Sequence, residues 1–117
     1  MDEAEARIEA EAIAFARAHK KEVARELTDS TKFPSDATPV SVFMAGSPGA
    51  GKTESSQNLI AKLTDDGHAV LRIDSDELRG RFESYTGSNS HLFQGATSIF
   101  AECMHDAALK NNQSFVF

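Results

Sequence analysis

The sequence predicts an α/β fold built on a parallel sheet and preceded by a long amphipathic helix. Three observations support this fold class. An apolar run at 39–45 leads into a glycine-rich turn, a helix-forming segment follows that turn, and a second apolar run comes after it at 68–73. Parallel strands need a crossover connection, and a strand, a helix and a strand in this order supply one.

The first predicted element is a helix over about residues 2–27, a segment rich in the helix formers Ala, Glu, Arg and Lys. Its apolar residues mostly recur every three or four positions, as one buried helix face requires. They are Ile8, Ala12, Phe15, Ala16, Val23 and Leu27. Residues 28–39 gather Thr, Asp, Ser and two prolines, which is typical of a linker. We therefore expect a helix and linker at 1–36 and a core domain at 37–117.

Strands and helices alternate through the rest of the chain. The run at 39–45 is β-branched and bounded by Pro and Gly, which predicts a buried strand of a parallel sheet. Further elements are expected as a helix at 52–64, a strand at 68–73, one or two helical turns at 77–82, a helix at 91–111 and a third strand from 113. The 52–64 helix should bury Leu59, Ile60 and Leu63, and the 91–111 helix should bury Leu92, Ala96, Ile99, Phe100, Cys103, Ala107 and Leu109.

The composition excludes several classes of function. The chain is 40% hydrophobic and 26% charged, as in ordinary globular proteins, and its net charge of −6 provides no basic surface for nucleic acid. The single cysteine, Cys103, cannot form an internal disulfide, and no Cys/His spacing suggests a metal. The N-terminal residues are acidic rather than signal-like, and no apolar run approaches the roughly 18 residues that span a bilayer. We expect a cytoplasmic protein that binds neither nucleic acid nor membranes.

The glycine-rich turn carries the strongest functional signal. Residues 46–53 match G-x-x-x-x-G-K-[ST], a phosphate-binding loop between a strand and a helix. Glycines allow the backbone to curl and to present successive N–H groups to phosphate oxygens, and the helix adds the positive end of its dipole. The predicted contacts to a nucleoside triphosphate are Gly46, Ser47, Gly49, Ala50, Gly51, Lys52 and Thr53. Lys52 supplies a charge for the β- and γ-phosphates, and the Thr53 hydroxyl is a ligand for Mg²⁺.

Two carboxylates, Asp74 and Asp76, follow the second predicted strand. Ligands of open α/β sheets bind at this end of the strands, and residues i and i+2 of a strand point the same way. One carboxylate could accept the proton of an acceptor hydroxyl while the other orients water around Mg²⁺. In the alternative interpretation, Asp76 merely caps the helix that begins at Glu77.

Other polar residues are weaker candidates. Arg72, Arg79 and Arg81 can reach phosphates or lie on the surface, and Glu102 lies beside the apolar stripe of its helix. Cys103 is interpreted as a core residue.

Two stretches together resemble the zeta-toxin family. They are Phe43–Glu54, which holds the phosphate loop, and Arg72–Arg79, which holds the Asp-x-Asp sequence; the resemblance covers about residues 40–117. Zeta toxins are P-loop kinases of bacterial toxin–antitoxin systems. The resemblance implies a P-loop kinase-like three-layer α/β sandwich, ATP or GTP with Mg²⁺ as cofactors, and an antitoxin protein as partner. It also implies a substrate, UDP-N-acetylglucosamine, phosphorylated on the sugar 3′-hydroxyl.

Individual roles follow from the same resemblance. Lys52 and Thr53 match the phosphate and Mg²⁺ contacts, so Lys52 joins Asp76, which matches the catalytic base, as a catalytic residue. Glu102 matches a glutamate that holds the sugar nucleotide. We assign Asp74 and Arg79 to substrate binding as well.

The resemblance also predicts that these residues are the N-terminal half of a kinase. Many members carry a His-Pro or similar element where this chain reads Arg81–Tyr85, and the family continues past the third strand with an acidic residue and phosphate-neutralising arginines. Residues 1–117 alone are therefore expected to associate or be poorly soluble and to lack activity, which an extension restores. Two alternatives are another small-molecule P-loop kinase, which an acceptor screen would separate, and an inactive remnant that binds a nucleotide or a partner.

Overall fold

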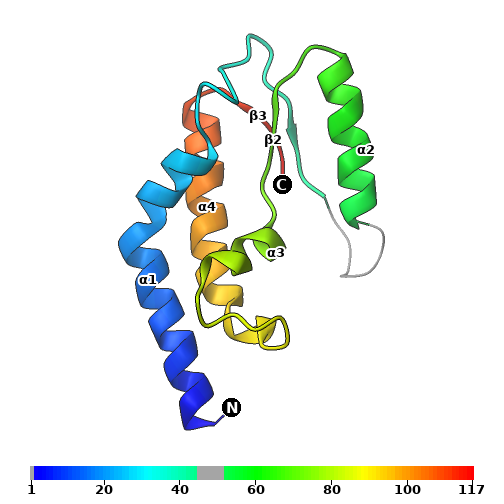
Figure 1. Ribbon diagram of the computed structural model, residues 1–117. Helices are drawn as coiled ribbons and strands as arrows, with labels where there is room; N and C mark the ends of the chain where they lie inside the picture. The colour runs from blue at the N-terminus through cyan, green and yellow to red at the C-terminus, as the bar shows by residue number, and fades with distance from the viewer. Residues whose placement is uncertain (1, 45–51) are drawn as a thin grey trace. The chain divides into compact units, whose positions relative to one another are not determined.

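The computed structural model describes residues 2–44 and 52–117, with backbone alone for residues 52 and 53, and its class is mixed α/β as predicted (Figure 1). The elements are α1 (Glu3–Leu27), β1 (Ser41–Val42), α2 (Lys52–Asp65), β2 (Val70–Arg72), α3 (Ser75–Leu78), the 3₁₀ turns η1 (Arg79–Arg81) and η2 (Ser90–Leu92), α4 (Gln94–Lys110) and β3 (Ser114–Val116). The chain forms two compact units. We call Met1–Leu27 with Asp74–Met104 the helical unit, and Thr28–Ile73 with His105–Phe117 the sheet unit.

The sheet unit is organised around a parallel three-stranded sheet of order β1-β3-β2. Leu71 of β2 is paired with Phe115 of the central strand β3, and both are buried. The predicted first strand is shorter and less buried than expected. Of the described residues 39–44, only Ser41–Val42 is strand, and Phe43 is 63% exposed. In the described sheet β1 is an edge strand, with β3 on one side.

Helix α2 begins and ends close to its predicted bounds, but it is less buried than expected. Leu59, Ile60 and Leu63 are only partly buried, and Ser56 is the residue of this helix that is fully buried among those described. The sheet that α2 accompanies is small, so it covers only part of the helix face.

The segment after α1 is fixed to the sheet rather than free. The Gln113 side-chain amide donates hydrogen bonds to the carbonyls of Thr28 and Phe33, each at 2.7 Å. Farther along, the Asp36 carboxylate accepts from His68 Nδ1 at 2.5 Å and from the Ser114 hydroxyl at 2.7 Å. These bonds, above all the one from His68, lower the pKa of Asp36 to about 2.

This carboxylate leads to a prediction about acid stability. Asp36 takes up a proton near pH 3.8 in the unfolded chain and only near pH 2 in the folded one. Its contribution to stability is therefore complete above about pH 3.8 and disappears as the pH falls through about 2. We expect Asp36→Asn to lower the melting temperature by several degrees at pH 7, with a difference from wild type that closes between pH 4 and pH 2. Thermal unfolding monitored by circular dichroism measures both, and the exposed Asp66→Asn is the control. A difference that is constant with pH would contradict the prediction.

In the helical unit, α1 runs alongside the first part of α4 (Figure 1), and the Ile13 side chain lies next to Gly95. The predicted stripe of α1 is confirmed at Ala12, Ala16 and Val23, which are buried. Phe15 is instead 43% exposed. Its ring touches Phe82 and Phe100 only edge-on, with centroids 5.8 and 6.4 Å away.

The buried face of α4 differs from the predicted stripe. Ala96, Phe100, Met104 and Ala108 are buried at helical spacing, whereas Leu109 is 51% exposed. A residue directly after Ala108 lies about 100° around the helix from it, so Leu109 points away from that face. Cys103, expected in the core, is only partly buried.

Candidate functional site

The acidic pair after β2 is arranged by a helix cap. Strand β2 ends at Arg72, and Asp74 is the N-cap of α3, accepting a hydrogen bond from the Asp76 N–H at 2.9 Å. Aspartate suits this position because its side chain satisfies a backbone donor that the helix cannot. The expectation that both carboxylates point the same way from a strand is therefore wrong, and so is the alternative that Asp76 is the cap. Asp76 lies in the first turn of α3.

Asp76 forms an ion pair with Arg79, three residues later, through Arg79 Nη2 and Asp76 Oδ1. The pair is unevenly exposed, since the Asp76 side chain is 72% exposed and the Arg79 side chain 23%. The guanidinium also lies over the Tyr85 ring, 5.9 Å from its centroid. The hydrogen bond with Asp76 is the main reason that the pKa of Arg79 is raised. Arg79 is thus a fixed cation next to an accessible carboxylate.

Both residues line a cavity of about 290 Å³ within the helical unit. Its lining combines hydroxyl, amide, carboxylate and guanidinium groups from Ser75, Asp76, Arg79, Ser90, Gln94, Thr97 and Ser98. Such groups can hydrogen-bond a ligand rich in hydroxyls, with Asp76 as a proton acceptor. Asn89 fixes the loop before Ser90 by accepting from the Thr86 N–H and donating to the Ser84 carbonyl, at 2.9 and 3.0 Å.

Sequence reasoning missed the contribution of Ser90 and α4 to this cavity. Gln94 and Ser98 are four residues apart and Thr97 lies between them, so they share one helix face. This polar face was a usable signal, but it resembles an ordinary solvated surface. Glu102 continues the face one turn later and is exposed, but it does not line the cavity. Its assignment to substrate binding stays a prediction.

The predicted phosphate loop lies largely outside the described residues, which omit 45–51. Lys52 and Thr53 are the first residues of α2, so a helix begins where the sequence predicts phosphate binding. This order, with β1 before the loop and α2 after it, fits a nucleotide with Mg²⁺. Over residues 2–44 and 54–117, no three His, Cys, Asp or Glu side chains are grouped so that they could hold a metal ion. The structure brings Asp74, Asp76 and Arg79 together in the helical unit, whereas Lys52 and Thr53 begin α2 in the sheet unit.

None of the described helices combines the length and the apolar composition needed to cross a membrane.

A parallel sheet with a helix beginning at Lys52 after its first strand, and an acidic pair after its second, defines a P-loop kinase-like class. Comparison with protein families gives the particular one. The family described as Zeta toxin matches residues 23–117, which is most of the chain. The chain belongs to the zeta-toxin family, a family of nucleotide-binding P-loop kinases. No curated protein and no solved structure matches it.

Proposed function

We propose that the protein transfers the γ-phosphoryl group of ATP or GTP to the sugar 3′-hydroxyl of UDP-N-acetylglucosamine. The observation that carries this proposal is the accessible Asp76 carboxylate, paired with Arg79 in a cavity lined by hydroxyl and amide groups. Membership of the zeta-toxin family supports the kinase chemistry at a coarser level. The sugar nucleotide is the more specific part of the proposal.

Each side chain has a distinct role in this proposal. Asp76 accepts the proton of the 3′-hydroxyl as that oxygen attacks phosphorus. Arg79 holds the carboxylate in place and contributes positive charge near the acceptor. Ser90, Gln94 and Ser98 hydrogen-bond sugar hydroxyls, and Glu102, one turn beyond Ser98, positions the nucleotide part.

The nucleotide belongs to the phosphate loop. Lys52 and Thr53 would hold the triphosphate and Mg²⁺. When bound, the triphosphate would supply the phosphoryl group and Mg²⁺ would neutralise its charge. Asp74 contributes by capping α3 and thereby fixing the turn that carries Asp76. We also propose that the protein acts in the cytoplasm as the toxin of a toxin–antitoxin pair.

An acceptor screen tests the proposal. ATP consumption is measured with UDP-N-acetylglucosamine, with free N-acetylglucosamine and with a panel of sugars and aminoglycosides, using residues 1–117 and, in parallel, any longer chain that the gene encodes. We expect turnover with the sugar nucleotide alone, and NMR of the product should place the phosphate on the 3′-oxygen. Turnover with another acceptor would indicate a different small-molecule kinase. Nucleotide binding without any turnover would favour the binding remnant.

A further inference from the structure

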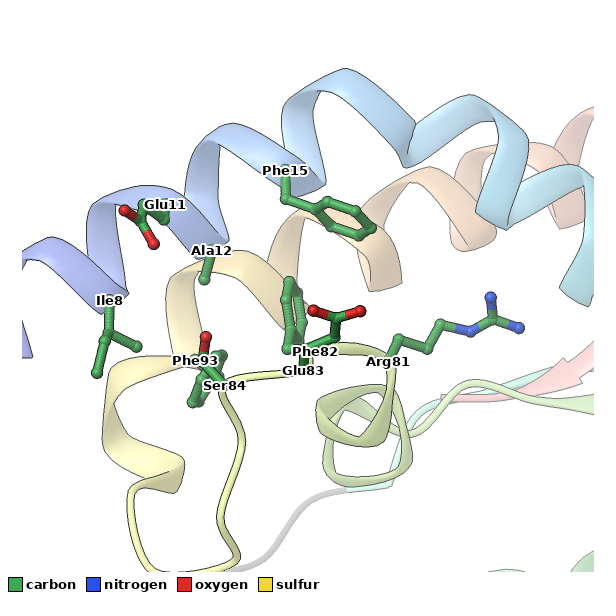
Figure 2. A pocket seen from close by; sticks show the side chains of 9 residues that line it. All are labelled: Ile8, Glu11, Ala12, Phe15, Arg81, Phe82, Glu83, Ser84 and Phe93. Carbon is green, nitrogen blue, oxygen red and sulfur yellow. The ribbon is translucent and has the colours of Figure 1, made fainter.

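A second cavity in the helical unit has no role in the proposed kinase reaction. It measures about 260 Å³ and lies between α1 and the chain from Arg81 to Phe93 (Figure 2). None of its described lining residues also lines the cavity of Asp76. We propose that it binds a small organic ammonium ion carrying an aromatic group.

The walls are apolar and aromatic. Ile8, Ala12 and Phe15 line the cavity from α1, and Phe82 and Phe93 line it from the opposite side (Figure 2). Phe82 and Phe93 are almost fully buried, with ring centroids 5.2 Å apart. Phe15 is the exposed ring, at 43%. The His19 ring packs against it, with centroids 4.4 Å apart, and a ligand placed here would cover apolar surface of Phe15 that is still exposed to water.

The charges around the cavity are predominantly negative. Glu11 and Glu83 line it, and neither forms a salt bridge among the described residues. Arg81 also lines it, but its guanidinium is held by Glu26, with Nη2–Oε1 at 3.0 Å and Nη1–Oε2 at 3.3 Å. With one positive and three negative groups, these four side chains sum to a formal charge of −2.

This charge selects the class of ligand. An ammonium group is attracted both by carboxylates and by the face of an aromatic ring. The same carboxylates repel anions from the cavity, including the phosphates of a nucleotide or a sugar nucleotide. The volume is just below the lower end of ordinary ligand pockets, which suits one ring with a short aminoalkyl chain.

The test uses 2-phenylethylammonium as the probe and 3-phenylpropionate as its anionic counterpart of similar size. Titrations of the ¹⁵N-labelled protein are followed by NMR. We expect the ammonium to bind with a Kd of about 1 mM or tighter, since small ligands gain little per atom. Chemical-shift changes should map to residues 8–15, 81–84 and 93, and the anion should bind at least about tenfold more weakly.

Variants separate the contributions of charge and ring. Glu11→Gln combined with Glu83→Gln should weaken ammonium binding about tenfold, and Phe15→Leu should weaken it about threefold by removing the ring face. All three residues are exposed, so the fold should be retained, which circular dichroism checks. Glu9→Gln, on the same helix but not lining the cavity, is the matched control and should bind as wild type does. Equal binding of the two probes, or unchanged binding by the double variant, would overturn the proposal.

Discussion

Asp76→Asn should lower phosphotransferase turnover by about 10²-fold or more, which is the usual effect of losing a positioned general base. The substitution keeps the shape of the side chain, and it can still accept a hydrogen bond from Arg79 through its amide oxygen. Because a base acts only in the chemical step, the affinity for ATP should scarcely change. Steady-state kinetics with the acceptor identified by the screen, together with calorimetric titration of ATP, measures the two effects separately.

Asp74 provides a matched control for this experiment. It lies two residues from Asp76 and caps α3, so Asp74→Ala should cost about 1 kcal/mol of stability. Asp74→Asn should restore most of that stability, because asparagine is an equally good cap. We expect both Asp74 variants to lose much less turnover than Asp76→Asn. Equal losses of turnover at the two positions would mean that the turn as a whole, rather than the Asp76 carboxylate, is what catalysis needs.

Lys52→Ala should weaken triphosphate binding by about 10- to 150-fold. Lys52 is the first residue of α2, and its ammonium group is expected to contact the β- and γ-phosphates. A charge-assisted contact of this kind contributes about 1.5–3 kcal/mol, which corresponds to about 10- to 150-fold in affinity. Calorimetry with ATP and Mg²⁺ measures the affinity.

The control for Lys52 is Lys62→Ala, near the C-terminal end of the same helix. Lys62 lies about 15 Å from Lys52 along the helix, at a rise of about 1.5 Å per residue. Lys62→Ala removes the same positive charge and should leave the affinity for ATP unchanged. Thermal unfolding checks that both variants keep the fold. Wild-type affinity in the Lys52 variant would contradict the assignment of the phosphate loop.

The order of elements could be predicted from sequence because each has its own local signal. Spacing of apolar residues located α1, and turn residues bounded α2 and β2. Burial could not be predicted equally well. Phe15 and Leu109 are apolar residues at or near helical spacing, but both are exposed, since exposure depends on which neighbour faces each residue. A hydrophobic pattern carries no information about that neighbour.

The candidate site shows the same limit. The sequence indicated Asp74 and Asp76 from their position after a strand, with Arg79 as a weaker candidate, and all three lie within one short turn. It could not separate the capping aspartate from the accessible one, because Asp is favourable both at the N-cap and in the first turn of a helix, and the residue at which the helix begins decides between them. The hydroxyl groups from η2 and α4 approach Asp76 only through folding.

The central position of β3 has a consequence for how the protein forms during translation. In the described sheet β1 and β2 do not pair with each other, and each bonds only to β3, which is synthesised after both of them. From Arg72, the end of β2, to Ser114, ribosomes working at about 5–20 residues per second need about 2–8 seconds. During that interval β1 and β2 have been synthesised but β3 is not yet available to pair with them. The nascent chain should therefore depend most on chaperones at this stage. Once β3, which contains Phe115, has been synthesised, it can pair with β1 and with β2 at the same time.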